Sequence, residues 1–205
     1  ANCACLMAVE SVAHDANDNI YIGDAGVGRI RRVDNATGLI ETVVGNGTVG
    51  YSGDGGDARS ARIGAPQSIC FDAAGSMYFA DAKCHVVRKV DANGIISTIA
   101  GTGESGFAPD GTAASAARLE VPYGVAISAT GQVYFSDTGN NCVRRIRSDG
   151  TLETVAGSRE GGDTGDGSAR ACRLNAPQGI CFYGADILLI SDRYNNKIKA
   201  VKLQT

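Results

Sequence analysis

The sequence predicts an all-β fold, a β-propeller built from four-stranded antiparallel blades, and three observations carry this prediction. A similar stretch of sequence recurs at intervals of 55 to 57 residues. The recurrence is clearest at four aspartates that each follow an apolar run: Asp24, Asp81, Asp137 and Asp192. Each interval contains short β-rich runs separated by turn residues. No long amphipathic helix lies between these runs, which favours propeller blades over a helical solenoid.

The third repeat shows the expected strands most clearly. Its β-rich runs are residues 124–128, 132–137, 141–146 and 152–157, with turn residues such as Gly131 between them. The same order of runs predicts blades at residues 9–45, 66–101, 122–157 and 177–205. The first three blades are complete, and the fourth has three strands only. The whole chain, residues 1–205, is therefore expected to be one propeller segment.

Long connections join one blade to the next, for example residues 101–122. In each connection an aspartate followed by glycine precedes an Ala-rich stretch: Asp54, Asp110 and Asp166. Such an aspartate can accept hydrogen bonds from the free N–H groups of a short helix, and the glycine permits the preceding turn. We therefore expect these three aspartates to cap helices of one or two turns.

The recurring motifs resemble those of the NHL repeat family of β-propellers. They are GDGG, A-x-x-A-R-L, P-x-G, Y-[IF]-[AS]-D-x-x-N-N-x-[IV]-R and T-[VI]-A-G, in fixed order over almost the whole chain. Departures occur at Ser68, at Gly26-Val27 and at Lys83-Cys84. The resemblance implies a larger propeller of about six blades. The N-terminal run NCACLMA could supply a closing strand, but it lies only a residue or two from the first inner strand, so a larger propeller or an assembly is favoured.

Composition and charge exclude two classes of partner. The formal net charge is -3, whereas nucleic-acid binders usually concentrate Lys and Arg on one face. No apolar run approaches 18 residues, so no membrane span is predicted. The basic pairs Arg31-Arg32, Arg88-Lys89 and Arg144-Arg145 fall on the third strand of each blade. We expect them on a solvated strand face that discourages edge pairing.

The seven cysteines favour disulfide bonds in an oxidising compartment. Propeller topology places five of them on or beside the loops of one face: Cys3, Cys5, Cys84, Cys142 and Cys172. Among these we favour a bridge between Cys142 and either Cys84 or Cys172. The other two, Cys70 and Cys181, occupy matching positions in inner strands and are expected to be buried apolar residues. An odd number leaves at least one thiol free or paired outside this chain.

Two glycosylation sequons, at Asn35 and Asn46, also point to a secreted or cell-surface setting. Both lie in turns where a glycan would project into solvent. A cytoplasmic protein-interaction module with reduced cysteines is the alternative.

The acidic and histidine residues do not favour catalysis. An aspartate that recurs in every blade suits a turn that recurs in every blade, because a catalytic residue is needed only once. The resemblance does extend to six-bladed propeller enzymes that use zinc or calcium. In this chain a channel metal site of that type would have only His14, Asp15 and Asp72 as ligands. We therefore predict no metal, no cofactor and no enzyme activity, with a metal-dependent lyase or hydrolase as the alternative.

We interpret the chain as a rigid binding or scaffolding module for a protein or glycan partner. Loops on a rigid scaffold are the usual place for recognition, so the working surface is expected on the face formed by the inter-blade connections and the loops between second and third strands. Candidate contact residues are those that break the repeat consensus: Tyr51, Phe107, Arg159, Glu160, Tyr194 and Asn195.

Overall fold

The computed structural model describes residues 5–165 and 167–203, and within them fifteen strands form four antiparallel sheets. Blade 1 contains β1 (Val9–His14), β2 (Ile20–Asp24), β3 (Arg29–Val33) and β4 (Ile40–Val44). Blade 2 contains β5 (Pro66–Phe71), β6 (Met77–Asp81), β7 (Val86–Val90) and β8 (Ile96–Ala100). Blade 3 contains β9 (Pro122–Ile127), β10 (Val133–Asp137), β11 (Cys142–Ile146) and β12 (Leu152–Ala156). Blade 4 contains β13 (Pro177–Tyr183), β14 (Ile187–Asp192) and β15 (Lys197–Lys202).

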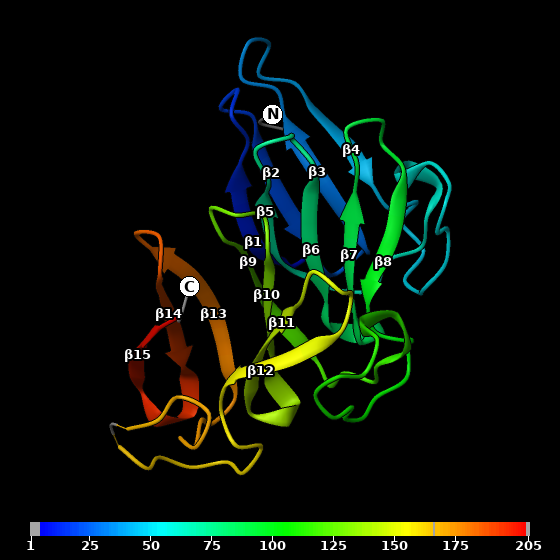
Figure 1. Cartoon of the computed structure of the whole chain (residues 1–205). Coiled ribbons are helices and arrows are strands. Elements are labelled where there is room, and N and C mark those ends of the chain that lie inside the picture. Colours follow the sequence, from blue (N-terminus) through cyan, green and yellow to red (C-terminus); the bar gives the residue numbers. More distant parts are fainter. Residues whose placement is uncertain (1–4, 166, 204–205) are drawn as a thin grey trace.

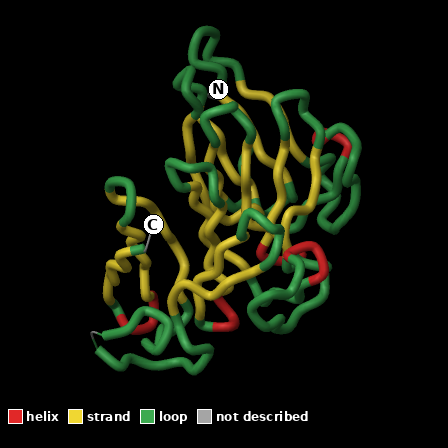
Figure 2. Tube along the Cα trace, in the orientation of Figure 1, coloured by secondary structure: helices red, strands yellow, loops and turns green. Residues whose placement is uncertain are grey.

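Each sheet is a meander in which strands adjacent in sequence pair with each other. Figure 1 shows the four sheets following one another along the chain, from blue to red, with long connections between them. The all-β propeller prediction is confirmed, including the three-stranded fourth blade. The only helical segments in the described residues are single 3-10 turns in the loops, drawn red in Figure 2: η1 (Ala58–Ser60), η2 (Ala82–Cys84), η3 (Ala114–Ala116), η4 (Thr138–Asn140) and η5 (Arg193–Asn195).

The hydrophobic core lies between successive blades, in three clusters. Alternation along each strand gives one face to the preceding blade and the other to the following blade, so both faces of an inner blade are apolar. In blade 2, Phe79 packs toward blade 1 and its neighbour Tyr78 packs toward blade 3. The side chain of Phe79 is completely buried, and truncation of such a residue to alanine costs roughly 3–5 kcal/mol.

The recurring aspartates at the ends of the second strands are buried and structural, as expected. Asp137 and Asp192 accept hydrogen bonds from Asn140 and Asn195 in their own turns, and the aspartates also bond backbone groups far from the turn. Asp81 accepts hydrogen bonds from the backbone N–H groups of Gly64 (2.7 Å) and Ala65 (2.9 Å), 16 to 17 residues upstream. Asp137 accepts one from Glu120 N (2.7 Å) in the same way. Each aspartate therefore fastens the incoming connection to the blade that it enters.

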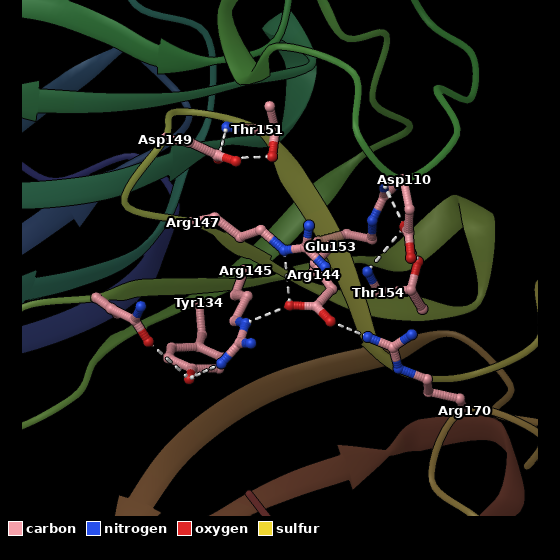
Figure 3. A network of polar contacts seen from close by, with 11 residues as sticks. Asp110, Tyr134, Arg144, Arg145, Arg147, Asp149, Thr151, Glu153, Thr154 and Arg170 are labelled. Carbon is pink, nitrogen blue, oxygen red and sulfur yellow. Dashed lines mark hydrogen bonds and ion pairs between the residues drawn. The ribbon is translucent and has the colours of Figure 1, made fainter. Parts of the chain in front are cut away.

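Two of the basic residues assigned to a solvated face are instead fully buried. Arg88 and Arg144 are 0% exposed, and each pairs with the aspartate of the preceding connection. The distance from Arg88 Nη2 to Asp54 Oδ1 is 2.6 Å, and that from Arg144 Nη2 to Asp110 Oδ1 is 3.2 Å. A buried guanidinium is tolerated only when paired, which explains why both partners recur. Figure 3 shows Asp110 between Arg144 and Thr154. The Asp110 carboxylate accepts a hydrogen bond from the backbone N–H of Thr154 (2.8 Å).

The capping role predicted for these connection aspartates is therefore wrong at Asp54 and Asp110. The residue that caps η1 is Asp57, whose carboxylate accepts a hydrogen bond from Arg59 N (2.9 Å). The start of η3 has no side-chain cap. The third aspartate, Asp166, lies outside the described residues.

Candidate functional site

The face that carries η2, η4 and η5 contains a groove at the junction of blades 2, 3 and 4. We call it the polar groove; it has a volume of about 490 Å³. Its polar and aromatic lining residues are Gln67, Tyr123, Thr138, Asn141, Asn175, Gln178, Arg193 and Tyr194. They come from the starts of the inner strands and from the turns after the second strands. The scaffold therefore places side chains from three blades around one concavity.

Gly139 lines the groove at the turn after β10. A Cβ at this position would overlap the side chain of Glu120. The repeat places Lys83 of blade 2 and Tyr194 of blade 4 at the equivalent positions, two residues after the recurring aspartate. Tyr194 is 61% exposed at the rim of the groove.

Asn141 fixes the wall of the groove. It adopts a left-handed conformation (φ 53°), which asparagine tolerates better than most residues. Its Oδ1 accepts a hydrogen bond from Ala176 N (2.9 Å), and its Nδ2 donates to the carbonyl of Arg159 (3.3 Å). The same position in blade 2 is His85, whose Nδ1 accepts from Val121 N (3.1 Å). His85 thus joins blades 2 and 3.

Backbone strain is concentrated at this face. Val121 (φ 49°) and Ala176 (φ 51°) both line the groove, and each precedes the proline that starts an inner strand. A left-handed conformation is unfavourable for any residue with a Cβ, and most of all for a β-branched one. Strained residues persist where the surrounding structure holds them, and they cluster at functional sites.

The groove carries a cation without a carboxylate partner. Within residues 5–165 and 167–203, Arg193 forms no ion pair, and its guanidinium lies 5.1 Å from the centre of the Tyr194 ring. Burial, with a further contribution from Glu10, raises the pKa of Tyr123. The Tyr123 hydroxyl is a hydrogen-bond donor at neutral pH, as an ordinary tyrosine is. A cation, two tyrosines and several amides suit an acidic or polar stretch of a partner.

The candidate residues Tyr51 and Phe107 turn out to hold equivalent positions in successive connections, so they do not break the repeat. The guanidinium of Arg88 lies 5.1 Å from the Tyr51 ring centre, and that of Arg144 lies 5.2 Å from the Phe107 ring centre. Both aromatic rings therefore cover a buried arginine.

Arg159 stacks on the other face of Phe107, with its guanidinium 3.6 Å from the ring centre. Arg159 is exposed, and its backbone is left-handed (φ 73°). The equivalent residues of the earlier connections are glycines, Gly47 and Gly103. Next to Arg159, Glu160 pairs with Arg173 at the surface. Because Arg159 is bonded through its carbonyl to Asn141, this stack lies beside the polar groove.

The last candidate, Asn195, is half-buried, and its amide is fully engaged. Its Nδ2 donates to Gly162 O (2.6 Å) and to Asp192 Oδ2 (2.8 Å). Asn140 repeats this pattern in blade 3 with Gly106 O (2.8 Å). Asn195 therefore stabilises the turn that presents Tyr194. Sequence reasoning missed Tyr123 and Arg193, although both differ from their equivalents in other blades and an alignment of the units would have identified them.

Six of the seven cysteines are described, and all six are free thiols. The predicted pairing of Cys142 with Cys84 or Cys172 is therefore not present, and Cys3 lies outside the described residues. Cys84 occupies the position of Asn140 and Asn195, and its Sγ contacts Gly50 O (3.2 Å). Burial raises the pKa of Cys84 to about 12 and that of Cys142 still further above its ordinary value. Cys181 is exposed, which corrects the expectation that it is buried.

The possible channel ligands do not converge. Asp15 accepts hydrogen bonds from Asn19 N (3.0 Å) and the Tyr21 hydroxyl (3.0 Å) in its own turn. Asp72 repeats this arrangement with the Tyr78 hydroxyl (3.0 Å) in the next blade. His14 is exposed and contacts the Asp15 carbonyl (3.1 Å). No group of three His, Cys, Asp or Glu side chains in the described residues is placed to hold a metal ion.

Comparison with known proteins identifies a family. A family model described as the Teneurin NHL domain matches residues 48–108 and 102–164, which together span more than half of the chain. Teneurin-3 of Mus musculus is 25% identical over 274 residues, an alignment that covers 89% of this chain and 10% of the mouse protein. The chain thus spans about a tenth of the length of this relative.

Solved structures share the fold. A protein of unknown function from Bacteroides thetaiotaomicron superposes with a TM-score of 0.76 at 21% identity, over 95% of this chain and 47% of the other. Virginiamycin B lyase from Staphylococcus aureus superposes with a TM-score of 0.56 at 14% identity, over 96% of this chain and 56% of the lyase. At these identities the likeness concerns the propeller alone. In the described residues, no helix is long and apolar enough to cross a membrane.

Proposed function

The chain belongs to the Teneurin NHL domain family, and from this premise we propose that it is a non-enzymatic module of an extracellular protein that binds a protein partner through the polar groove. The family match confirms the NHL repeat resemblance of the sequence. Arg193 supports this binding surface most. It forms no ion pair within the described residues, and it lies beside the exposed Tyr194 at the rim of a preformed concavity.

The chemistry of the groove supports a protein partner. Tyrosine and arginine are enriched where protein interfaces concentrate their binding energy. The amides of Asn141 and Asn175 line the groove, and that of Asn141 keeps one N–H and one oxygen lone pair beyond its bonds to Arg159 O and Ala176 N. Hydrogen bonds from Val121 N to His85 and from Ala176 N to Asn141 hold the groove walls in place, so little ordering is required when a partner binds.

The exposure of the two sequons supports the extracellular setting. Asn35 and Asn46 are both exposed, Asn35 in a turn of blade 1 and Asn46 in the connection that follows β4, and neither lines the polar groove. If the chain is secreted and glycosylated at these sites, its mass should exceed the 21.0 kDa of the polypeptide and fall to about that value after deglycosylation.

A cell-binding experiment tests the proposed function. Fluorescent tetramers of the chain should bind intact cells in a saturable manner, and Tyr194→Ala or Arg193→Ala should reduce the binding at least about tenfold, which is typical of an interface hot spot. Tyr183→Ala is the matched control, because Tyr183 is similarly exposed but lies at the end of the inner strand β13, outside the groove lining.

Pretreatment of the cells distinguishes the chemistry of the partner. Removal of surface proteins with protease should abolish binding, whereas removal of glycans should leave it unchanged. Loss after deglycosylation alone would identify a glycan partner instead. Equal effects of Tyr194→Ala and Tyr183→Ala would contradict the assignment of the groove.

A further inference from the structure

Three arginine side chains surround one carboxylate at the outer part of blade 3. Glu153 of β12 accepts hydrogen bonds from Arg145 Nε (2.6 Å) and Arg147 Nε (3.0 Å), and it also pairs with Arg170 of the connection into blade 4 (Figure 3). We call these three arginines the arginine cluster. The neighbouring Asp149 is engaged in its own turn. One carboxylate offsets one guanidinium, and arginine stays charged at neutral pH, so the cluster has a surplus of two positive charges.

Blade 1 carries the same arrangement without the surplus. There Glu41 pairs with Arg32 of the third strand and with Arg59 of the connection that follows. The place of Arg147 is taken by Asp34, whose Oδ2 lies 3.9 Å from Arg32 Nη2. The two arginines and two carboxylates of blade 1 therefore cancel. The repeat is stable with balanced charges, so the surplus at blade 3 is not a requirement of the fold.

The arginine cluster keeps hydrogen-bond donors for a ligand. Arg147 bonds Glu153 through Nε alone, and neither of its Nη groups has a hydrogen-bond partner among the described residues. Arg145 uses Nε for Glu153 and Nη1 for the Tyr134 hydroxyl (3.5 Å), which leaves its Nη2 without a partner there. The side chains of Arg147 and Arg145 are 42% and 25% exposed, so a ligand can reach them. Guanidinium groups bind tetrahedral oxyanions through paired N–H bonds.

Two cavities adjoin at Arg145, which lines both of them. The first has a volume of about 370 Å³ and lies beside Glu153 and Arg170. The second has a volume of about 430 Å³ and lies between the loops that join the first and second strands of blades 3 and 4. We call the second one the aromatic cavity, because Tyr134 and Phe182 form part of its wall. A space of this size with apolar walls and a few polar groups suits an aromatic ring.

The junction of blades 1 and 2 contains a cavity of the same kind with a different charge. Its volume is about 340 Å³, and the equivalents of Tyr134, Phe182 and Arg145 line it. The hollow is therefore a property of the blade junction. Asp57 and Asp91 also line the cavity between blades 1 and 2. The junction of blades 3 and 4 instead combines aromatic walls with the surplus of positive charge.

We propose that the arginine cluster and the aromatic cavity together bind an aromatic oxyanion ester, the sulfate or phosphate group of a modified tyrosine in a protein partner. The ester oxygens accept hydrogen bonds from the Nη groups of Arg147 and Arg145, and the ring of the modified tyrosine enters the aromatic cavity. Arginine clusters recognise phosphorylated segments of proteins in this way. A sulfate ester carries one negative charge and a phosphate ester about 1.5 to 2, which the surplus of two positive charges matches.

This site is separate from the polar groove and does not depend on the function proposed for it. Tyr123 of the groove lies at the start of β9, whereas Ser128 and Thr130 of the aromatic cavity follow the end of that strand. The two sites therefore lie at opposite ends of the inner strand. Tyr194→Ala, which is expected to weaken binding at the groove, should leave binding at the arginine cluster unchanged.

Titration with short peptides tests the site and identifies the ester. One neutral, fluorescently labelled peptide with a single tyrosine is used in its unmodified, sulfated and phosphorylated forms, and anisotropy reports binding. At least one modified form should bind saturably and at least about tenfold more tightly than the unmodified form, the gain expected from one charge-assisted hydrogen bond. The tighter of the two modified forms identifies the ester. A phosphoserine peptide, which has the charge without the ring, should bind more weakly than the phosphotyrosine peptide.

Three protein variants complete the test. Arg147→Asp gives blade 3 the charges that blade 1 carries at Asp34, so the variant should fold and bind the modified peptide at least about tenfold more weakly. Arg170→Ala should also weaken binding. Arg59→Ala is its matched control and should bind normally, because Arg59 is the equivalent residue of the balanced blade and is similarly exposed, at 62% against 56%.

Three results would overturn the proposal. The first is the absence of saturable binding of either modified peptide up to about 1 mM, the limit of weak association. The second is equal binding of the unmodified peptide, or of the phosphoserine and phosphotyrosine peptides. The third is normal binding by Arg147→Asp, or equal losses for Arg170→Ala and Arg59→Ala. Thermal unfolding of each variant separates a loss of binding from a loss of fold.

Discussion

Glu153 and Glu41 occupy the same position in blades 3 and 1, and we predict that neutralising them has very different effects. Glu153 accepts hydrogen bonds from Arg145 Nε (2.6 Å) and Arg147 Nε (3.0 Å) and also pairs with Arg170 (Figure 3). Its side chain is 8% exposed. The Arg147 hydrogen bond is the largest cause that holds the pKa of Glu153 at about 2, below its usual value of 4.5.

This pKa sets an upper limit for the effect of Glu153→Gln on stability. At about 1.4 kcal/mol per pKa unit, a fall from 4.5 to about 2 corresponds to about 3 kcal/mol. The arginine side chains are 25% to 56% exposed, so solvent screens part of this energy and the expected loss is about 1–2 kcal/mol. Glu41 pairs with Arg32 and Arg59 but is 41% exposed, so Glu41→Gln should cost about 0–1 kcal/mol.

Chemical denaturation at several pH values is the assay. A carboxylate whose folded pKa is depressed stabilises the protein above its unfolded pKa, and this stabilisation is lost as pH falls through the folded pKa. The stability difference between wild type and Glu153→Gln should therefore be full at pH 7, shrink below about pH 4.5 and be nearly gone at pH 2. Equal losses for the two variants, or a difference that does not depend on pH, would refute the reasoning.

Three further predictions concern single side chains and are measured by thermal unfolding. Arg144→Ala should destabilise by about 3–5 kcal/mol, because it removes the cation that lies 3.9 Å from the fully buried carboxylate of Asp137; a loss below 1 kcal/mol would contradict this. Val27→Asn should stabilise by about 1 kcal/mol, because Asp24 Oδ2 is buried without a hydrogen-bond partner among the described residues and an amide at position 27 would donate to it. Blades 3 and 4 carry an asparagine at this position. No gain in stability would show that the amide does not reach Asp24. Arg159→Gly should raise stability by about 1 kcal/mol by relieving its left-handed backbone, and an unchanged melting temperature would show that its stacking on Phe107 offsets the strain.

The sequence was sufficient for the fold because every blade repeats the same alternation and the same turns. Burial of the basic residues was not predictable in the same way. Arg88 and its partner Asp54 lie 34 residues apart. The sequence near Arg88 therefore does not indicate that a carboxylate pairs with its guanidinium. Likewise, the hydrogen bonds of Asp81 cross from a blade to its incoming connection, although the residue looks like an ordinary turn aspartate.

The candidate site was predicted in part. The expected face does carry a groove, and Tyr194 lies at its rim. The cation of the groove, Arg193, lies one residue before the predicted tyrosine, at a position where the other blades carry alanine or threonine. Tyr51 and Phe107 looked distinctive in sequence, but their shared role of covering a buried arginine depends on a contact across the blade.

Site-specific photo-crosslinking tests the central claim, that the polar groove binds a protein, most directly. The photoreactive amino acid p-benzoylphenylalanine would replace Tyr194 at the groove rim or Tyr183 at the end of the inner strand β13, which are 61% and 68% exposed. The account predicts a discrete protein adduct on intact cells from position 194 and none from position 183. Adducts of the same pattern from both positions, or none from position 194 while tetramers still bind, would contradict it.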